Sequence, residues 1–273
     1  TLFSMWRYAI SDAAEFYGEA AWYEAASSHT REPSNPLSSH PVTIPASNYW
    51  NPFGSLTLAD GSLNPNRLPG IDAPPEGLPI LINTRGMGGF YRVADAGPRT
   101  VEVDNHTDRL LFGLRAWLGN WSADGALLYS TASTDDTTRN RISSTAFQQT
   151  LALSTADAYN PFNGGDPQRL TYGDATANHP EVVEKFLIDV GRRNTTSLKL
   201  ADAVLTNLDA FRFGGRPAGI SVGAEWRREQ FRETRDPRLN GEVGYTDLVT
   251  GERYASDVMQ SSITPDSAGA REV

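Results

Sequence analysis

The chain has 273 residues, a formal net charge of -9, a mean hydropathy of -0.43 and no cysteine. Its acidity argues against a nucleic-acid partner, because phosphate binding requires concentrated lysine and arginine. The lack of cysteine excludes disulfides, thiolate metal sites and a cysteine nucleophile. No long apolar run is present, which excludes transmembrane helices but leaves open membrane-spanning strands, in which only alternate residues are apolar.

The first predicted element is a hairpin of two strands, residues 1–11 and 16–26, joined by a short turn at Ser11-Asp12. Apolar and polar residues alternate along both arms, as in a strand with two different faces. No change of composition divides the sequence, so residues 1–273 are expected to form one domain. Because the chain begins at Thr1, inside a strand pattern, we expect a mature or internal piece of a longer polypeptide.

Residues 27–97 show no sustained period and are rich in Pro, Gly, Asn and Ser. Connections of this length are uncommon in compact soluble domains and usually have a function. An aromatic group, Asn48 to Gly54, lies within this connection. Its Tyr49 and Trp50 are expected either to fix the connection in place or to contact a ligand, and the sequence leaves both roles open.

The central hairpin, Asp108 to Thr131, has the clearest pattern in the chain. Leucine and phenylalanine occupy one face of its first arm, whereas Arg115 and Asp124 occupy the opposite face of the two arms. The arms meet at Gly119-Asn120, with a tryptophan on each side of the turn. This pattern is typical of a transmembrane barrel, with lipid outside, a polar lumen inside and aromatic rings at the water interface.

A second irregular region is predicted for residues 133–184, with a short helix at 145–153 capped by Ser143 or Ser144. A third hairpin follows, with arms at 186–206 and 218–231. Its first arm places Asp202 in phase with leucine and valine, so that a carboxylate would lie on an apolar face. A bulge or a position near lipid headgroups would explain this, and both explanations remain open. From Thr234 onward the pattern predicts loop without a further strand.

Short turns therefore alternate with long connections through six predicted strands, which is the asymmetry of bacterial outer-membrane barrels. We interpret one set of residues as interface aromatics: Trp6, Trp22, Trp117, Trp121 and Trp226. We expect a second, charged set to face the lumen and to contact mainly one another, a plug or water: Arg7, Glu19, Arg115, Asp124, Glu225 and Arg227.

No catalytic arrangement is evident, so the sequence predicts neither an enzyme nor a cofactor. The four histidines lie in loop-like sequence without the spacing of a zinc helix, and we expect no metal site. The run from Asp104 to Asp108 is interpreted as a solvated loop and not as a cation site. No serine occupies a Gly-x-Ser-x-Gly elbow.

Five strings carry a resemblance to a known family: residues 139–143 (RNRIS), 158–166 (AYNPFNGGD), 223–229 (GAEWRRE), 236–239 (DPRL) and 256–259 (SDVM). Together they resemble TonB-dependent outer-membrane receptors, particularly the group found in sphingomonads and their relatives. The resemblance covers essentially the whole chain. It implies an all-β fold, an antiparallel transmembrane barrel of about 22 strands around an amino-terminal plug, of which this chain supplies about six.

The resemblance also implies a function: energy-coupled import of a scarce nutrient, such as a ferric siderophore, a corrinoid or an oligosaccharide, across the outer membrane of a Gram-negative bacterium. The expected partners are the remainder of the same receptor, TonB acting through the plug, outer-membrane lipid and lipopolysaccharide, and the nutrient itself. Tyr49, Trp50 and Tyr159 are candidates for nutrient contact, because aromatic faces suit both sugars and bulky chelates.

Two other functions stay open. The first is a soluble β-sandwich, acting as a carbohydrate-binding module or a glycan-acting enzyme, with Trp and Tyr as sugar platforms. Such a protein would extract into buffer without detergent. The second is a passive porin, which a plug sequence encoded upstream of Thr1 would argue against.

Overall fold

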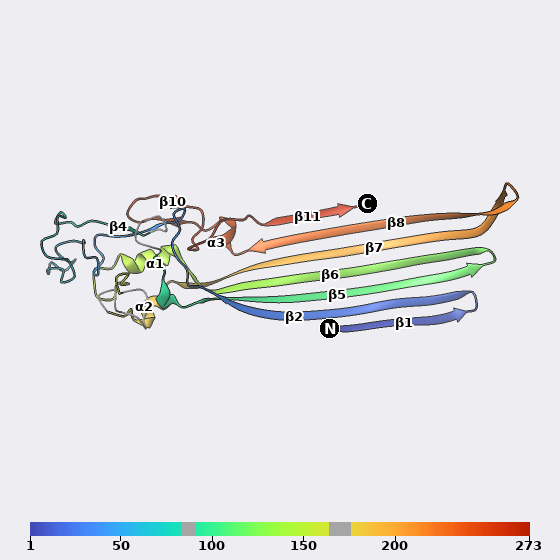
Figure 1. Ribbon diagram of the computed structural model, residues 1–273, viewed down its shortest axis with the longest axis horizontal. Helices are drawn as coiled ribbons and strands as arrows, with labels where there is room; N and C mark the ends of the chain where they lie inside the picture. Colours follow the sequence, from blue (N-terminus) through green and yellow to red (C-terminus); the bar gives the residue numbers. More distant parts are fainter. Residues whose placement is uncertain (83–90, 164–175) are drawn as a thin grey trace.

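The computed structural model describes residues 1–82, 91–163 and 176–273 (Figure 1). Its main feature is one seven-stranded antiparallel sheet with the order β1-β2-β5-β6-β7-β8-β11. The strands are β1 (Leu2–Ser11), β2 (Ala14–Arg31), β5 (Arg99–Leu118), β6 (Trp121–Ile142), β7 (Leu187–Phe213), β8 (Arg216–Arg235) and β11 (Ser267–Glu272). Strands account for most of the chain's regular structure, which confirms an all-β fold. No helix in the described parts of the chain is long and apolar enough to cross a membrane.

The three predicted hairpins are present, but their strands are longer than the sequence pattern indicated. β2 continues to Arg31 and β6 to Ile142, through segments that we had expected to be loops. The strand residues from Asp104 to Asp108, and also His29, are therefore not in loops. These extensions are polar on both faces, so no alternation marks them. Ladder hydrogen bonds to neighbouring strands and the β-branched threonines of β6 stabilise them instead.

The absence of a strand after Thr234 was a wrong prediction. β11 pairs with β8 from the Ser267–Glu233 pair to the Glu272–Arg228 pair, so the sheet has seven strands where six were expected. β11 carries mainly small and charged residues, so its sequence shows no alternation of apolar and polar residues that would predict a strand. β1 and β11 are the outer strands of the sheet, each paired on one side among the described residues.

The ladder register gives the sheet two unlike faces. Residues in one row point to the same side, and the row that begins at Trp6 continues through Gly18, Phe112 and Leu127 to Trp226. We call the side of this row the apolar face. Its large members are Leu2, Trp6, Tyr8, Phe16, Trp22, Leu110, Phe112, Leu114, Leu118, Trp121, Leu127, Tyr129, Leu205, Ile220, Val222 and Trp226.

The opposite side is the charged face, and the register places Asp202 on it, opposite Glu225. The residues that β7 contributes to the apolar face near Asp202 are Ala201, Ala203 and Leu205. The bulge in β7 lies farther along, between Asn207 and Phe211. Neither explanation that we considered for Asp202 is therefore needed, because the leucines in phase with it lie on the charged face.

The described parts of the long connections fold together at one end of the sheet into a cap, which we define as residues 32–82, 91–98, 143–163, 176–186 and 236–266 (Figure 1). It contains β3 (Val42–Ile44), β4 (Ile80–Ile82), β9 (Tyr245–Thr246), β10 (Arg253–Tyr254), a 3-10 turn η1 (Ala94–Ala96), α1 (Ser144–Leu151), α2 (Pro180–Glu184) and α3 (Pro237–Asn240). The predicted helix is confirmed as α1, capped by Ser143, whose hydroxyl accepts from the N–H of Ala146.

The cap has its own hydrophobic core, which residues from all three connections form. Phe147, Tyr159 and Phe186 meet edge to face with ring centroids 5.0–5.4 Å apart. The rest of the core consists of Val42, Ile44, Val93, Ala96, Ile142, Leu151, Val182, Val183 and Met259. The buried core of this protein thus lies beside the sheet and not on its face, so the cap is a compact unit and not a set of independent loops.

Candidate functional site: the charged face of the sheet

All six charged residues that we expected on one side lie on the charged face, in three adjacent rows of the ladder. One row joins Arg115 to Asp124. The next row runs from Arg7 to Glu225, and the third from Glu19 to Arg227. Strand alternation alone predicted the side of each residue, and pairing between strands brings the rows together.

A closed network centres on Asp124. The hydroxyl of Tyr17 donates to Asp124 Oδ1 at 2.7 Å, and Arg115 Nε donates to Oδ2 at 2.7 Å. Arg115 also reaches Glu15 at 3.3 Å and stacks on the ring of Tyr17, with its Cζ 4.5 Å from the ring centroid. Every charge in this group has a partner, which makes this part of the face a fixed structural element more than a binding surface.

Sequence patterns did not single out Tyr17 or Glu15. Both lie on β2, two strands away from Asp124, so only the tertiary pairing reveals their contacts. The sequence did indicate on which side they lie, since Glu15, Tyr17 and Glu19 occupy every second position of β2 and therefore share one face.

The second part of the charged face, over β7, β8 and β11, is less complete in its pairing. Arg227 contacts Glu229, whereas Glu225 stands directly opposite Asp202, a like charge. Arg271 of β11 makes no ion pair with any described residue. Unpaired charges of both signs make this part the better candidate for contact with a polar ligand or a complementary protein surface.

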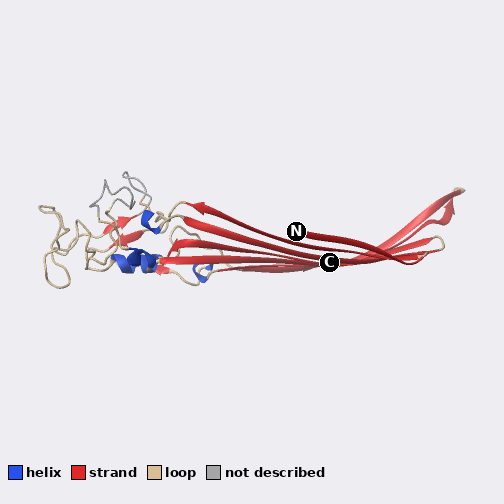
Figure 2. Cartoon of the chain, turned by 90° about the horizontal axis from the view of Figure 1, so that it is seen from below, coloured by secondary structure: helices blue, strands red, loops and turns tan. Residues whose placement is uncertain are grey.

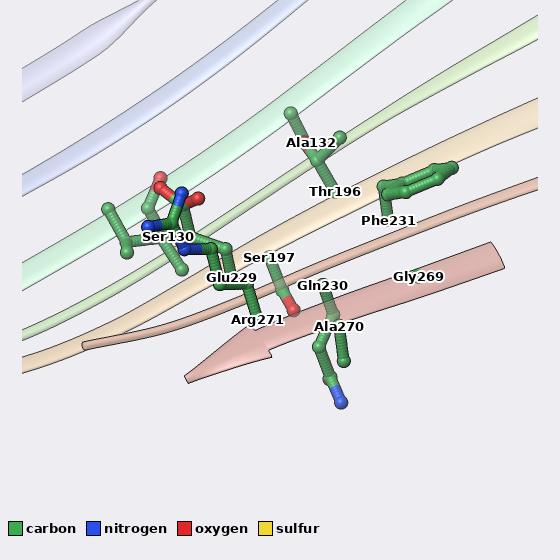
Figure 3. A pocket seen from close by; sticks show the side chains of 11 residues that line it. Ser130, Ala132, Thr196, Ser197, Glu229, Gln230, Phe231, Gly269, Ala270 and Arg271 are labelled. Atoms are coloured by element: carbon green, nitrogen blue, oxygen red, sulfur yellow. The ribbon is translucent and has the colours of Figure 1, made fainter. Parts of the chain in front are cut away.

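A hollow of about 500 Å³ lies over these strands (Figure 3). Phe231 covers Gly269, where an added Cβ would lie 2.5 Å from the phenyl ring. Figure 3 shows Glu229 and Arg271 side by side at one end of the hollow and Phe231 at the other. Hydroxyls of Ser130 and Thr196 complete the lining. The hollow therefore combines one ring, hydroxyls and charges of both signs.

Four of the five tryptophans interpreted as interface aromatics lie on the apolar face. Trp117 does not, because it pairs with Ser122 and shares the side of Arg115. The tight turn explains this, because Trp121 pairs with Leu118 in the last row before the turn, whereas Trp117 lies in the neighbouring row. Neighbouring rows point to opposite faces of the sheet. Trp117 alternates with Arg115 along the strand, so the sequence pattern already placed it on this side, and it lies at the short-turn end of the sheet.

The loop aromatics have structural roles in the cap. Tyr159 has no exposed surface, and its hydroxyl donates to Asp95 at 2.6 Å and accepts from Tyr91 at 3.0 Å. This burial contradicts direct nutrient contact by Tyr159. Trp50 is half-buried and its indole N–H donates to the carbonyl of Ala158, while Tyr49 packs edge to face on Trp50. These two rings keep partial exposure and remain candidates.

Three of the strings that carry the family resemblance converge at one junction under the cap. Asp257 accepts from the Ser143 hydroxyl at 2.6 Å and from the Thr145 N–H at 2.8 Å, and Arg238 lies 3.5 Å away. Arg141 donates to the carbonyl of Met259 at 2.9 Å, and burial lowers the pKa of Arg141 to about 10. Residues 164–166 of a fourth string lie outside the described residues.

A second group of buried polar residues lies in the cap. Burial alone would raise the pKa of Asp247, but hydrogen bonds from the N–H groups of Thr250, Thr43 and Val249 keep the pKa of this carboxyl below its ordinary value. His40 donates or accepts at the Ser144 hydroxyl, 2.8 Å away, and burial lowers the pKa of its imidazole. No cluster of three or more potential metal ligands occurs among the described residues.

No protein-family model matches this sequence, and comparisons with curated proteins and with solved structures returned no match. The function proposed below therefore depends on the geometry of the sheet and cap and on the resemblance in the sequence.

Proposed function

We propose that the sheet is a section of the wall of a transmembrane β-barrel in the outer membrane of a Gram-negative bacterium. We further propose that the protein is a TonB-dependent receptor, not an enzyme, which imports a scarce nutrient. The single observation that supports this most strongly is the contrast between the two faces of one sheet.

The apolar face is open to solvent over its central part. Leu127 is 63% exposed and Val222 is 62% exposed. Figure 2 shows the sheet as a single layer, and among the described residues no second sheet packs on it. Contiguous apolar surface of this extent marks contact with lipid or with another protein. A soluble β-sandwich would instead bury this face under a second sheet, so the exposed layer disfavours that alternative.

The height of the apolar face suits a bilayer. On β5 the apolar face extends from Leu110 to Leu118, and the next residue on the same side of this strand is Asp108. A tilted strand needs about 9–11 residues to cross the hydrocarbon core. Beyond Asp108, the same side carries His106 and Asp104, which suit water and not hydrocarbon. The apolar face is therefore a band of limited height.

The short turns are staggered from one hairpin to the next (Figure 1). The β1–β2 turn closes at the level of Ala116, and the β5–β6 turn closes two residues farther, at the Leu118–Trp121 pair. The β7–β8 turn closes farther still, at the Phe213–Arg216 pair. Strands that tilt at about 35–45° to a barrel axis require such a stagger, which supports a curved, tilted wall.

The two ends of the sheet are unlike. Tight turns close one end, whereas the cap covers the other. In outer-membrane barrels, short turns face the periplasm and long loops face outside. We therefore propose that the cap is extracellular and that the charged face lines the lumen, where the plug, water or a passing nutrient would meet Arg271 and Glu225. Outer-membrane lipid and lipopolysaccharide would surround the apolar face.

Cell fractionation tests the location, and a transport assay tests the function. The protein is expected in the outer-membrane fraction and to require detergent for extraction; extraction into buffer alone would instead favour a soluble binding module. Uptake of the nutrient is expected to stop when TonB is deleted. Uptake that persists without TonB would favour a passive porin. Substituting Tyr49 or Trp50 by Ala is expected to weaken uptake while assembly continues, and unchanged uptake would remove these residues as nutrient contacts.

A further inference from the structure

The β7–β8 hairpin differs from the other two hairpins in its tip, which we define as residues 208–219. The tip projects beyond the other turns and bends away from the plane of the sheet (Figures 1 and 2). Three large apolar side chains lie on it with little cover: Leu208 is 81% exposed, Phe213 is 80% exposed and Phe211 is 53% exposed. A tight turn needs none of these residues, because Gly214 and Gly215 at positive φ already form it.

The register shows where the two rings point. Asn207 pairs with Ile220 in the last row of the apolar face. The bulge that follows inserts two extra residues in β7, and regular pairing resumes at Phe211 with Ala218. An even insertion preserves parity, so Phe211 and Phe213 continue the apolar face beyond its lower edge. The bulge thus lengthens and bends the arm without turning the rings to the charged face.

Two arginines accompany the rings. Arg216 is the direct cross-strand partner of Phe213 and lies on the same side as both rings. Arg212 pairs with Pro217 in the next row, so it lies on the opposite side of the hairpin. Both arginines are exposed, and neither makes an ion pair or side-chain hydrogen bond with a described residue. Asp209 is the single acidic residue of the tip. In a chain of net charge -9, the tip is therefore locally cationic and has two guanidinium groups available.

We propose that the tip binds an anionic phospholipid of the membrane leaflet at the short-turn end. Phe211 and Phe213 lie against its acyl chains, and the guanidinium group of Arg216, on the same side of the hairpin, holds its phosphate. Arginine suits this role because its planar fork matches phosphate oxygens in two parallel hydrogen bonds. Aromatic rings beside cations at the end of an apolar band are the arrangement that anchors proteins at a lipid interface. The inference rests on the proposed membrane location.

A lipid fits the tip better than a protein partner does. The rings continue a face that is proposed to touch hydrocarbon already, and Arg216 follows on the same side where that face ends. A protein partner would have to cover residues on both sides of a projecting, bent hairpin. A free phosphate ion would use Arg216 but leave the rings without a role.

The test compares binding of fluorescent phosphatidylglycerol and phosphatidylcholine to the receptor purified from membranes in mild detergent. The test variant is Arg216→Gln. The matched control is Arg232→Gln, an exposed arginine of the same strand nearer the cap. The preference for phosphatidylglycerol is expected to fall about fivefold in the test variant, the value for one cation near an anionic lipid surface, and to stay unchanged in the control. A second variant, Phe211→Ser with Phe213→Ser, is expected to weaken binding of both lipids.

The inference is overturned if the test variant keeps the preference, if the control loses it equally, or if inorganic phosphate displaces the lipid completely. It is also overturned if a photo-crosslinker at position 213 labels a protein and not lipid. Reconstitution in bilayers separates the two proposals. A receptor that inserts in both lipids without preference contradicts the tip site alone, whereas failure to insert in either contradicts the membrane location.

Discussion

The ring of Tyr17 lies across Gly113, its direct cross-strand partner, so closely that a Cβ at position 113 would fall 2.0 Å from Tyr17 Cζ. This placement brings the Tyr17 hydroxyl to Asp124, two strands away. The pairs Trp6–Gly18 on the apolar face and Phe231–Gly269 near the hollow repeat the arrangement. An aromatic ring over a strand glycine restores the packing that the glycine lacks.

Gly113→Ala is expected to displace Tyr17 and break its hydrogen bond to Asp124, which destabilises the sheet by about 1–3 kcal/mol. Gly191→Ala is the matched control, because an added Cβ there meets no atom closer than the carbonyl oxygen of Asp136 at 3.4 Å. Unfolding by urea in detergent micelles measures the difference. Equal free energies of unfolding for the two variants would contradict the close contact at Gly113.

Two consecutive residues of β6 test the proposal that the apolar face meets lipid. Leu127→Arg puts a charge at the centre of the apolar face, and Leu128→Arg puts the same charge on the charged face. At the middle of a bilayer, an arginine on the lipid side of a barrel costs about 2–4 kcal/mol, whereas lumen positions tolerate charge. The amount of assembled protein in outer membranes is expected to fall only for Leu127→Arg. Equal loss for both variants would argue that neither face touches lipid.

Asp257 connects the end of β6 to the third connection of the cap through Ser143, Thr145 and Arg238. Asp257→Asn removes the charge and replaces one of the two acceptor oxygens with an NH₂ donor, so that one of the two donors, Ser143 or Thr145, loses its partner, a cost of about 1–3 kcal/mol. Faster hydrogen exchange is expected in α1 and in residues 236–259. The control Asp60→Asn changes an exposed carboxylate whose hydrogen bonds go only to Ser62. Unaltered exchange in Asp257→Asn would exclude a joining role for this residue.

The stability of the cap is expected to depend on pH through His40. Burial lowers the pKa of His40 in the folded protein below the ordinary value of 6.5. Between these two values the unfolded chain binds more protons, so stability rises with pH. The contribution is complete above about 6.5 and is lost as the pH falls toward the lower folded pKa. Hydrogen exchange of α1 at several pH values measures this, and His40→Gln is expected to flatten the dependence between pH 5 and 7. An unchanged profile in that variant would assign the effect to other groups.

The sequence by itself determined the strands of the apolar band and the side to which each of their residues points. It did so because alternation has a period of two, so a residue's parity fixes its face once the strand is recognised. The charged residues from Arg7 to Arg227 were assigned to one side on this basis. The short helix was equally readable, since Ser143 caps it locally.

Only the tertiary structure decided the polar extensions of β2 and β6, the added strand β11, and the partner of Asp202. These depend on pairing between segments far apart in the chain, and such pairing leaves no period in either segment. The cap shows this most clearly: Tyr159 looked like an exposed loop aromatic, but residues from the other connections bury it completely. The local sequence specifies the face of a strand to which each side chain points, whereas the burial of a side chain depends on which distant parts of the chain pack against it.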